Sequence, residues 1–267
     1  MDRNGLSIAE NVDHTLVEFS MMETLHPISL QQSDCSSEPQ GRFERQKFKI
    51  RMASNQERRQ TAVFLVEKMY GWRGYNTSGV SEKLAATAKP AEDVTHISLM
   101  VYGQDNRPVG TLTVGFDGPK GMLADELYRG ELDALRGQDK RLLEFTKLAI
   151  DRHASNSNRI VAALTNIAYL YGKMSNCNTA VIEVHPRHVA FYESKLGFRQ
   201  VGPERLCTRV NAPAILLAIE WDAMAEEIRK YGGRKDDGTA GKSLYRYFID
   251  EHDEAGLIKR LAGTEVG

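Results

Sequence analysis

Two groups of residues in this sequence have types and surroundings that suit chemistry. Glu144 is a carboxylate in the middle of an apolar segment, residues 141–150, which alternates like an inner strand. Further along the chain, His185, Arg187 and His188 surround a proline where an apolar segment changes to helical periodicity. A carboxylate in an apolar sheet has a raised pKa and can accept a proton. Cationic groups at a helix N-terminus can hold an anion.

Each of these residues also has a purely structural interpretation, and the sequence leaves both interpretations open. Glu144 is either a proton acceptor or half of a buried ion pair with Lys147 or an arginine. Arg187 and His188 either bind an anion or close the helix N-terminus, and His185 can be a turn residue ahead of the proline. In strict alternation, Lys147 lies on the face of the strand opposite Glu144.

Two strand–helix units must position these side chains. Residues 141–150 and 179–184 are predicted to be strands, and each is followed by a helical pattern. Gly197 ends the second helix. Where neighbouring parallel strands diverge at their carboxyl ends, an elongated ligand can lie between them. We therefore expect a ligand gap between residues 142–150 and 179–184.

The remaining elements complete an α/β (α+β) fold, a mixed sheet with helices on both faces. Further strands are predicted at residues 48–52, 95–102, 109–116, 199–201 and 214–219, and further helices at residues 57–71, 123–135, 221–231 and 243–261. A short helix is predicted within residues 15–25. Trp72 and Arg73 lie in an aromatic and basic loop, which either contacts substrate or forms a packed rim.

We divide the chain into three parts. Residues 1–45 are polar and are expected to form a flexible extension. Residues 46–220 form the domain that carries the candidate site. Residues 221–267 form a helical tail, which can cover the body, pair subunits or dock a partner, and the sequence does not choose among these.

Composition and charge narrow the classes of function. Hydrophobic residues make up 41% and charged residues 27%, as in an ordinary soluble protein, and the net charge of −1 gives no field that would favour nucleic acid. The three cysteines, Cys35, Cys177 and Cys207, lack the spacing of a zinc site, and their odd number does not suggest a disulfide framework. No histidine–carboxylate pair has zinc spacing either. With no signal-peptide or membrane-span pattern either, we expect a cytoplasmic protein without a metal.

Several motifs together resemble the GNAT acyltransferase superfamily. They are the element order, residues 109–113 (Val-Gly-Thr-Leu-Thr), the Glu144 strand, and Ala190-Phe-Tyr192 ahead of Leu196-Gly-Phe198. The resemblance implies a twisted mixed sheet of about seven strands flanked by helices. Vicinal-oxygen-chelate enzymes share the last motif, but they require a duplicated module and metal ligands, and no duplication is visible.

One departure from ordinary GNAT enzymes is informative. Their glycine-containing loop for the pyrophosphate of acetyl-CoA should follow the Glu144 strand. Residues 152–158 at that place contain no glycine. A donor without this pyrophosphate, such as an acyl chain on the phosphopantetheine of an acyl carrier protein, is therefore favoured.

More closely, about residues 46–220 resemble the long-chain N-acyl amino acid synthases, the FeeM-like relatives of the acyl-homoserine lactone synthases. It is carried by Gly71-Trp72, Glu144-Phe-Thr-Lys147, His185-Pro-Arg-His188 with Phe191-Tyr192, and Arg209-Val-Asn-Ala-Pro213. It implies transfer of a long acyl group from acyl carrier protein to the α-amine of an amino acid. The lactone synthases have arginine where this chain has Lys147, so a homoserine-lactone product is disfavoured.

The resemblance also implies roles for single residues. Glu144 would accept the proton of the amino group, and Tyr192 would protonate or hydrogen-bond the departing thiolate, unless it is only a core tyrosine. The predicted substrate-binding residues are Trp72, Arg73, Lys147, Arg187, His188 and Asn211, with Arg187 and His188 on the pantetheine phosphate. Basic residues near the donor entrance could steer an acidic carrier protein: Lys140, Arg141, Arg152, Arg159 and Lys195.

No permanently bound cofactor is implied, because the acyl-phosphopantetheine thioester arrives on acyl carrier protein or on coenzyme A. The alternatives left open are an acyl-CoA-dependent N-acetyltransferase, an enzyme like the lactone synthases, and a non-catalytic lipid or acyl-carrier binding protein. A lipid product would also allow peripheral contact with a membrane. The sequence does not set the acceptor side chain, the acyl length or the oligomeric state.

Overall fold

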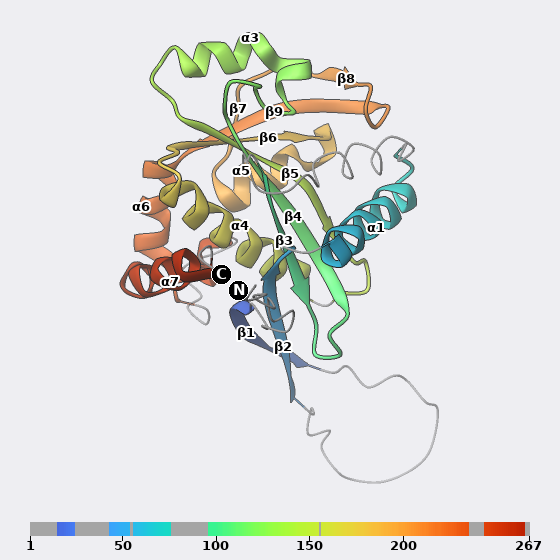
Figure 1. Ribbon diagram of the computed structural model, residues 1–267, viewed down its shortest axis with the longest axis vertical. Helices are drawn as coiled ribbons and strands as arrows, with labels where there is room; N and C mark the ends of the chain where they lie inside the picture. Colours follow the sequence, from blue (N-terminus) through green and yellow to red (C-terminus); the bar gives the residue numbers. More distant parts are fainter. Residues whose placement is uncertain are drawn as a thin grey trace, which may run out of the picture.

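A twisted sheet organises the computed structural model, which describes residues 15–24, 43–53, 56–75, 96–154, 156–234 and 243–264 (Figure 1). Within these residues the sheet has nine strands in the order β1-β2-β3-β4-β5-β6-β9-β7, with β8 paired to β9. Neighbouring strands are antiparallel except for β5 and β6, which are parallel. The predicted mixed sheet is therefore confirmed, with more strands than the seven expected.

The strands are β1 Thr15–Thr24, β2 Phe43–Met52, β3 His96–Tyr102, β4 Pro108–Phe116, β5 Leu142–Ile150, β6 Thr179–Val184, β7 Arg199–Gln200, β8 Arg205–Cys207 and β9 Ala212–Glu220. The helices are α1 Gln56–Trp72, α3 Asp125–Arg136, α4 Ser157–Met174, α5 Val189–Leu196, α6 Trp221–Tyr231 and α7 Glu251–Thr264, with short 3₁₀ turns η1 Pro186–His188 and η3 Tyr245–Tyr247. The helices predicted from apolar periodicity at 57–71, 123–135 and 221–231 are confirmed to within a few residues.

The divergence of β5 and β6 is the feature that makes room for a ligand. Their pairing runs from Leu142 opposite Thr179 only to Phe145 opposite Ile182. Beyond that point β5 stays paired with β4, but its register shifts, because Thr113 faces Thr146 while Thr111 faces Ala149. A bulge of this kind bends a strand. The gap predicted between these two strands is confirmed.

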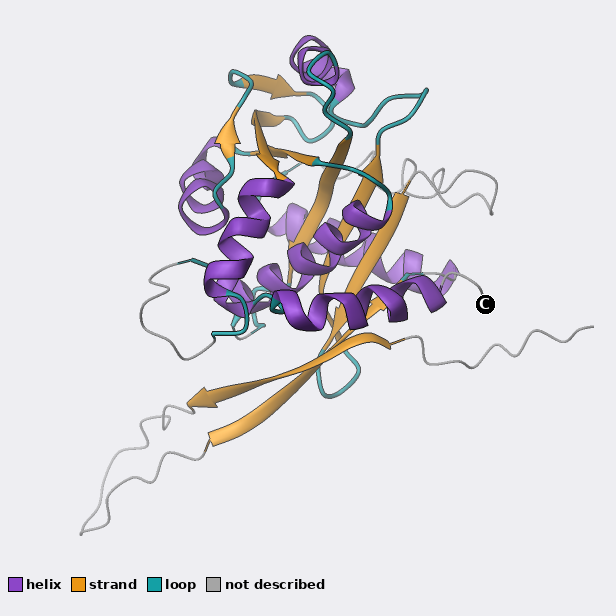
Figure 2. Ribbon diagram, turned by 90° about the vertical axis from the view of Figure 1, so that its left-hand side faces the viewer, coloured by secondary structure: helices purple, strands orange, loops and turns teal. Residues whose placement is uncertain are grey.

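Helices cover both faces of the sheet, as predicted (Figures 1 and 2). On one face, the apolar side of α4 packs with Leu143 and Phe145 of β5, and α5, α6 and α7 add to the same core. On the other face, α3 packs against Leu142 and Val181, and α1 packs against Ala149. Because each strand presents alternate residues to the two faces, β5 supplies both cores.

The helix predicted within residues 15–25 is wrong. These residues form β1, which pairs antiparallel with β2 along the edge of the sheet and runs out with it as a two-stranded ribbon (Figure 2). Leu16 is buried with Phe48 of β2, so pairing with a sheet edge outweighs a weak local helical preference. The rest of the extension, residues 1–14 and 25–42, lies outside the described residues.

The C-terminal tail covers the body, one of the three possibilities that the sequence left open. Tyr245, Phe248, Leu257 and Leu261 are buried in the same core as α4. The Tyr245 hydroxyl also donates a hydrogen bond to the carbonyl of Leu196 at the end of α5, at 2.7 Å. No helix in the described part of the chain is both long and apolar enough to span a membrane.

Candidate active site

A cavity of about 930 Å³ opens where β5 and β6 separate. Its walls come from the end of α1, from β5, from the start of α4, from the β6–α5 junction and from residues 207–214. Apolar side chains such as Phe145, Val161 and Ile182 share this lining with charged ones. The volume falls in the range of small-molecule sites, roughly 300–1,000 Å³.

Glu144 lies buried in this wall, with both carboxylate oxygens bonded to backbone. Oε1 accepts the N–H of Leu123 and Oε2 accepts the N–H of Ala124, each at 3.0 Å, at the start of α3. Burial raises the pKa of Glu144, and the two N–H donors oppose that shift. On the neighbouring strand a Cβ at Gly115 would lie 2.9 Å from the Glu144 side chain, so only glycine leaves room for it. Glu144 therefore holds the beginning of α3 against the sheet.

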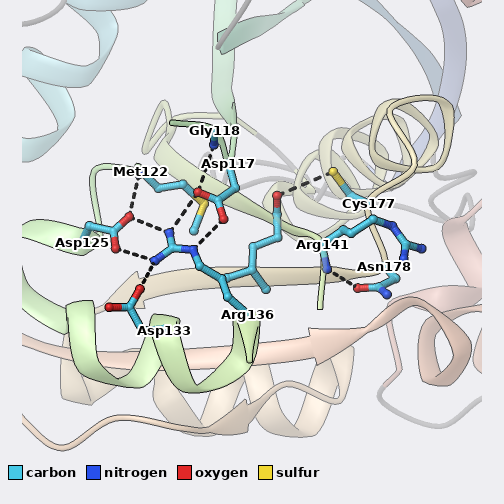
Figure 3. Close-up of polar contacts among 10 residues, drawn as sticks. Asp117, Gly118, Met122, Asp125, Asp133, Arg136, Arg141, Cys177 and Asn178 are labelled. Atoms are coloured by element: carbon cyan, nitrogen blue, oxygen red, sulfur yellow. Dashed lines mark hydrogen bonds and ion pairs between the residues drawn. The ribbon is translucent and has the colours of Figure 1, made fainter. Parts of the chain in front are cut away.

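An arginine fixes the turn that Glu144 contacts (Figure 3). Arg136 donates hydrogen bonds to Asp117, Asp125 and Asp133 at 2.7–2.9 Å. Asp125 also accepts the N–H of Met122 at 2.7 Å, and the Arg136 hydrogen bonds hold the pKa of Asp125 below its usual value. This cluster thus sets where the N–H groups next to Glu144 point. A hydrogen bond of 2.8 Å from the Arg141 N–H to Asn178 ties the starts of β5 and β6 together in the same view.

Glu183 is a second carboxylate in the cavity wall, on β6, and the sequence analysis missed it. One oxygen, Oε2, forms an ion pair with Arg209. The other, Oε1, is buried and has no hydrogen-bond partner among the described residues. Burial raises the pKa of Glu183, while Arg209 acts in the opposite direction. A carboxylate inside an apolar strand is the same signal that identified Glu144, so it was available in the sequence.

Lys147 lies in the bulge of β5 with a left-handed backbone, φ 55°. It lines the cavity and makes no hydrogen bond or ion pair to any described residue. Burial lowers the pKa of Lys147, and the charge of Glu144 opposes that shift. Burial, with the charge of Lys147 acting in the same direction, lowers the pKa of His96, which shares a face of the sheet with Glu144. The bulge interrupts the strict alternation of β5 at Lys147, so the face expected for this side chain stays a prediction.

The opposite wall brings α1 and α5 together. Tyr192 lines the cavity and packs edge-on against Phe198, with ring centres 5.8 Å apart. Burial strongly raises the pKa of Tyr192, and burial also raises that of Tyr70 to about 12. Burial, reinforced by the charges of Arg73 and Arg187, lowers the pKa of His188 to about 4, so this imidazole is neutral at pH 7.

The family model of the N-acyl amino acid synthase FeeM matches residues 61–220. The chain belongs to this family. The structure of FeeM, an N-acyl amino acid synthase from uncultured soil microbes, is 27% identical with a TM-score of 0.59, and the match covers 67% of this chain and 93% of FeeM. FeeM-family membership makes the chain an N-acyltransferase of the GNAT type, which confirms the resemblance read from the sequence.

Two GNAT acetyltransferases match over a similar span at lower similarity. Aminoglycoside 6'-acetyltransferase type Ii is 15% identical with a TM-score of 0.44, covering 64% of this chain and 96% of that enzyme. The spermidine/spermine N-acetyltransferase SpeG from Vibrio cholerae is 13% identical with a TM-score of 0.47, covering 67% and 96%. No functionally curated sequence matches this chain.

In this FeeM-family chain, five of the eight predicted site residues line the cavity: Arg73, Glu144, Lys147, His188 and Tyr192. The other three lie around it. Arg187 donates a hydrogen bond of 2.6 Å to the Tyr75 hydroxyl, and Trp72, 59% exposed, stacks on Arg152 at 5.2 Å. Asn211 is exposed in the turn before β9 with φ 49°, a conformation that asparagine tolerates. The catalytic and binding roles given to these residues stay predictions.

The described residues contain no group of three or more His, Cys, Asp or Glu side chains arranged to hold a metal ion.

At the far end of the cavity, Asp151 joins three elements. It accepts hydrogen bonds from Lys68 of α1 at 3.3 Å, from Arg107 of the β3–β4 hairpin at 3.1 Å and from the His153 N–H at 2.9 Å. Asp151 is thus a structural anchor for the end of β5.

Proposed function

We propose that this FeeM-family enzyme transfers a long acyl chain from the thioester of an acyl carrier protein to the α-amine of an amino acid. The observation that carries the proposal is the mixed lining of the cavity between β5 and β6. Two carboxylates, Glu144 and Glu183, face a space that apolar side chains also line. Lys147 faces the same space and makes no hydrogen bond or ion pair to a described residue. Such a space suits a charged acceptor next to a fatty chain.

The acceptor is an amino acid because the site offers both signs of charge. An amino acid arrives as a zwitterion, and its carboxylate needs a cation. Lys147 is half-buried in the wall and makes no hydrogen bond or ion pair to a described residue, so a ligand that supplies the counter-charge would stabilise its ammonium. We assign the acceptor carboxylate to Lys147. An amine that lacks a carboxylate would leave this charge unpaired.

The donor is a phosphopantetheine thioester on a carrier protein. Residues 152–158, where a pyrophosphate loop would lie, contain no glycine, and Arg152 stacks on Trp72 at the edge of the cavity. The proposed phosphate contacts are Arg187 and His188 at the β6–α5 junction, and surface cations, including Arg152 and Arg159, would attract an acidic carrier protein. A carrier-protein donor would place the reaction in the cytoplasm.

The chemistry removes two protons from the nitrogen. The ammonium loses one proton to a carboxylate, and the free amine then attacks the thioester carbonyl carbon, so that the C–N bond forms. The tetrahedral intermediate expels the thiolate, breaking the C–S bond, and the second proton from nitrogen ends on the thiol. We propose that Tyr192 gives its hydroxyl proton to that thiolate and then takes up the proton that leaves the nitrogen. The net products are the amide, the free thiol and one proton.

The test is to incubate the purified protein with long-chain acyl carrier protein and each of the twenty amino acids, and to search for N-acyl products by mass spectrometry. We expect an acylated amino acid that depends on the carrier protein. Saturable turnover with short-chain acyl-CoA and indifference to the carrier protein would instead establish the coenzyme A-dependent alternative. Binding of acyl carrier protein without any product under all these conditions would establish the non-catalytic one.

A further inference from the structure

Glu183 has the one buried carboxylate oxygen in the cavity wall that is left without a partner among the described residues. Its side chain is 16% exposed, and Arg209, 13% exposed, holds the other oxygen. Arg209 is itself anchored, because it also donates to the carbonyl of Leu123 at 3.3 Å and to Glu126 at 2.9 Å. Glu183 is therefore fixed at one oxygen and open at the other.

Glu144 differs from Glu183 in this respect. Both of its oxygens already accept backbone N–H groups, from Leu123 and Ala124. Protonating Glu144 would weaken these two bonds and release the start of α3. Hydrogen bonds to the charged form of a carboxylate oppose its protonation. Oε1 of Glu183 accepts no hydrogen bond from a described residue, so a proton can add there without displacing one.

The position of Glu183 also suits an acceptor amine. It lies on β6 one residue past the last pair of the β5–β6 ladder, where the strands separate. Glu183 shares its face of β6 with Val181, which pairs with Glu144 across the ladder. The gap next to this pair is the place where an elongated donor would present its thioester carbonyl.

We propose that Glu183 binds the ammonium group of the acceptor through Oε1 and accepts its first proton, and that Glu144 is a positioning residue for the start of α3. This inference rests on the proposed N-acyl transfer and assigns its base. One N–H bond of the ammonium breaks and one O–H bond of the Glu183 carboxyl forms. The neutral amine then attacks the thioester, and the protonated Glu183 loses its proton to solvent after the product leaves.

Charged and titratable groups face Glu183 from each element packed against it: Tyr70 of α1, Glu126 and Tyr128 of α3, Glu144 of β5 and Arg209 of the turn between β8 and β9. Arg209 is in direct contact, and it favours the anionic form that accepts a proton. Glu131 of α3 pairs with a different arginine, Arg205, and neither residue lines the cavity, so Glu131 provides a matched control.

The experiment measures kcat/KM for the amino acid in Glu183→Gln, with Glu131→Gln and Glu144→Gln beside it, from pH 6 to pH 9. We expect Glu183→Gln to lose at least about 100-fold at pH 7, the size of a general-base contribution. Its remaining activity should rise about tenfold per pH unit, because only free amine can react and its fraction grows tenfold per unit below the amine's own pKa. The wild-type rate should be nearly flat there, and Glu131→Gln should stay within about threefold of it.

Several outcomes would overturn the inference. If Glu183→Gln keeps its activity, or if its activity falls without acquiring the steep pH dependence, Glu183 does not take the proton. If Glu144→Gln acquires that dependence instead, the role belongs to Glu144. Should Glu183→Gln fail to fold, Glu183→Ala serves, because it also removes the carboxylate, and a loss below about tenfold with a flat profile would count against the proposal. Failure of the proposed function looks different, since the wild type would then acylate no amino acid from any thioester.

Discussion

At the scale of single residues, the site is defined by which polar atoms are already bonded. Glu144 and Glu183 look alike in sequence, since each interrupts an apolar strand. The structure separates them, because backbone N–H groups occupy both oxygens of Glu144 while one oxygen of Glu183 has no partner among the described residues. A raised pKa is common to both and does not distinguish them.

Lys147 allows a direct test of the acceptor class. If its ammonium binds the acceptor carboxylate, Lys147→Met should raise the KM for the amino acid by about 10- to 100-fold, because a hydrogen bond to a charged group contributes about 1.5–3 kcal/mol. The KM for the corresponding amino acid amide should change much less. Lys120, an exposed lysine in the turn before α3, provides the control Lys120→Met.

Steady-state kinetics with both acceptors checks this prediction. An equal loss for acid and amide would mean that Lys147 acts on the shape of β5 rather than on the carboxylate. Lys147 has φ 55°, and any residue without glycine's freedom is strained in that conformation. Lys147→Met keeps the same strain, so it changes only the charge.

At the scale of elements, the Arg136 cluster positions the wall of the site from outside it. Arg136→Met should leave buried Asp125 without its cation, and breaking such a pair costs about 3 kcal/mol. We expect a lower melting temperature together with a lower kcat, since the N–H groups of residues 123 and 124 would no longer be held toward Glu144. Arg129, exposed on the same helix, provides the control Arg129→Met. A variant with wild-type stability would contradict the role of the cluster.

Asp151 gives the fold a pH dependence at the other end of β5. Its pKa is lowered to about 2, since hydrogen bonds from the His153 N–H, Arg107 and Lys68 outweigh the opposing effect of burial. A folded-state pKa below the unfolded value of about 3.9 contributes stability that is complete above that value and is lost as the pH falls toward 2. The contribution at neutral pH is about 2 kcal/mol.

Asp151→Asn should therefore lower the unfolding free energy at pH 7 and flatten its dependence between pH 4 and pH 2. Urea unfolding at a series of pH values measures both effects. Asp105, an exposed carboxylate in the β3–β4 turn, serves as the control Asp105→Asn. If the two variants follow the same curve, the contacts of Asp151 with Lys68 and Arg107 do not matter for stability.

The sequence was sufficient to predict elements with long, regular apolar periods. It was not sufficient to predict features that depend on contacts between distant segments. The helices at residues 57–71 and 221–231, the strands around Glu144 and Val181, and the gap between them follow from periodicity and from the rules of parallel strands. The strand at 15–24 does not, because its partner is the sheet edge. The bulge at Lys147 and the approach of residues 123 and 124 to Glu144 also depend on tertiary structure, which sequence spacing does not contain.

At the scale of the whole molecule, the C-terminal tail is part of the domain that carries the site. Its buried residues complete the core under α4, and Tyr245 bonds to the end of α5, the helix that bears Tyr192. Because α5 supplies one wall of the cavity, support from the tail reaches the site through that helix. The tail therefore contributes to stability first, and to activity only through the position of α5.

Leu257 tests this arrangement, because it is 1% exposed on α7 while Lys259 on the same helix is exposed. Leu257→Ala should cost about 2–5 kcal/mol of unfolding free energy, as burial of a leucine in a packed core predicts, whereas Lys259→Ala should be nearly neutral. The molecular mass in solution should be the same for both variants, since Leu257 is covered within a single chain. Thermal unfolding and light scattering measure the two quantities. A change of mass in Leu257→Ala with unchanged stability would show that the tail pairs subunits instead.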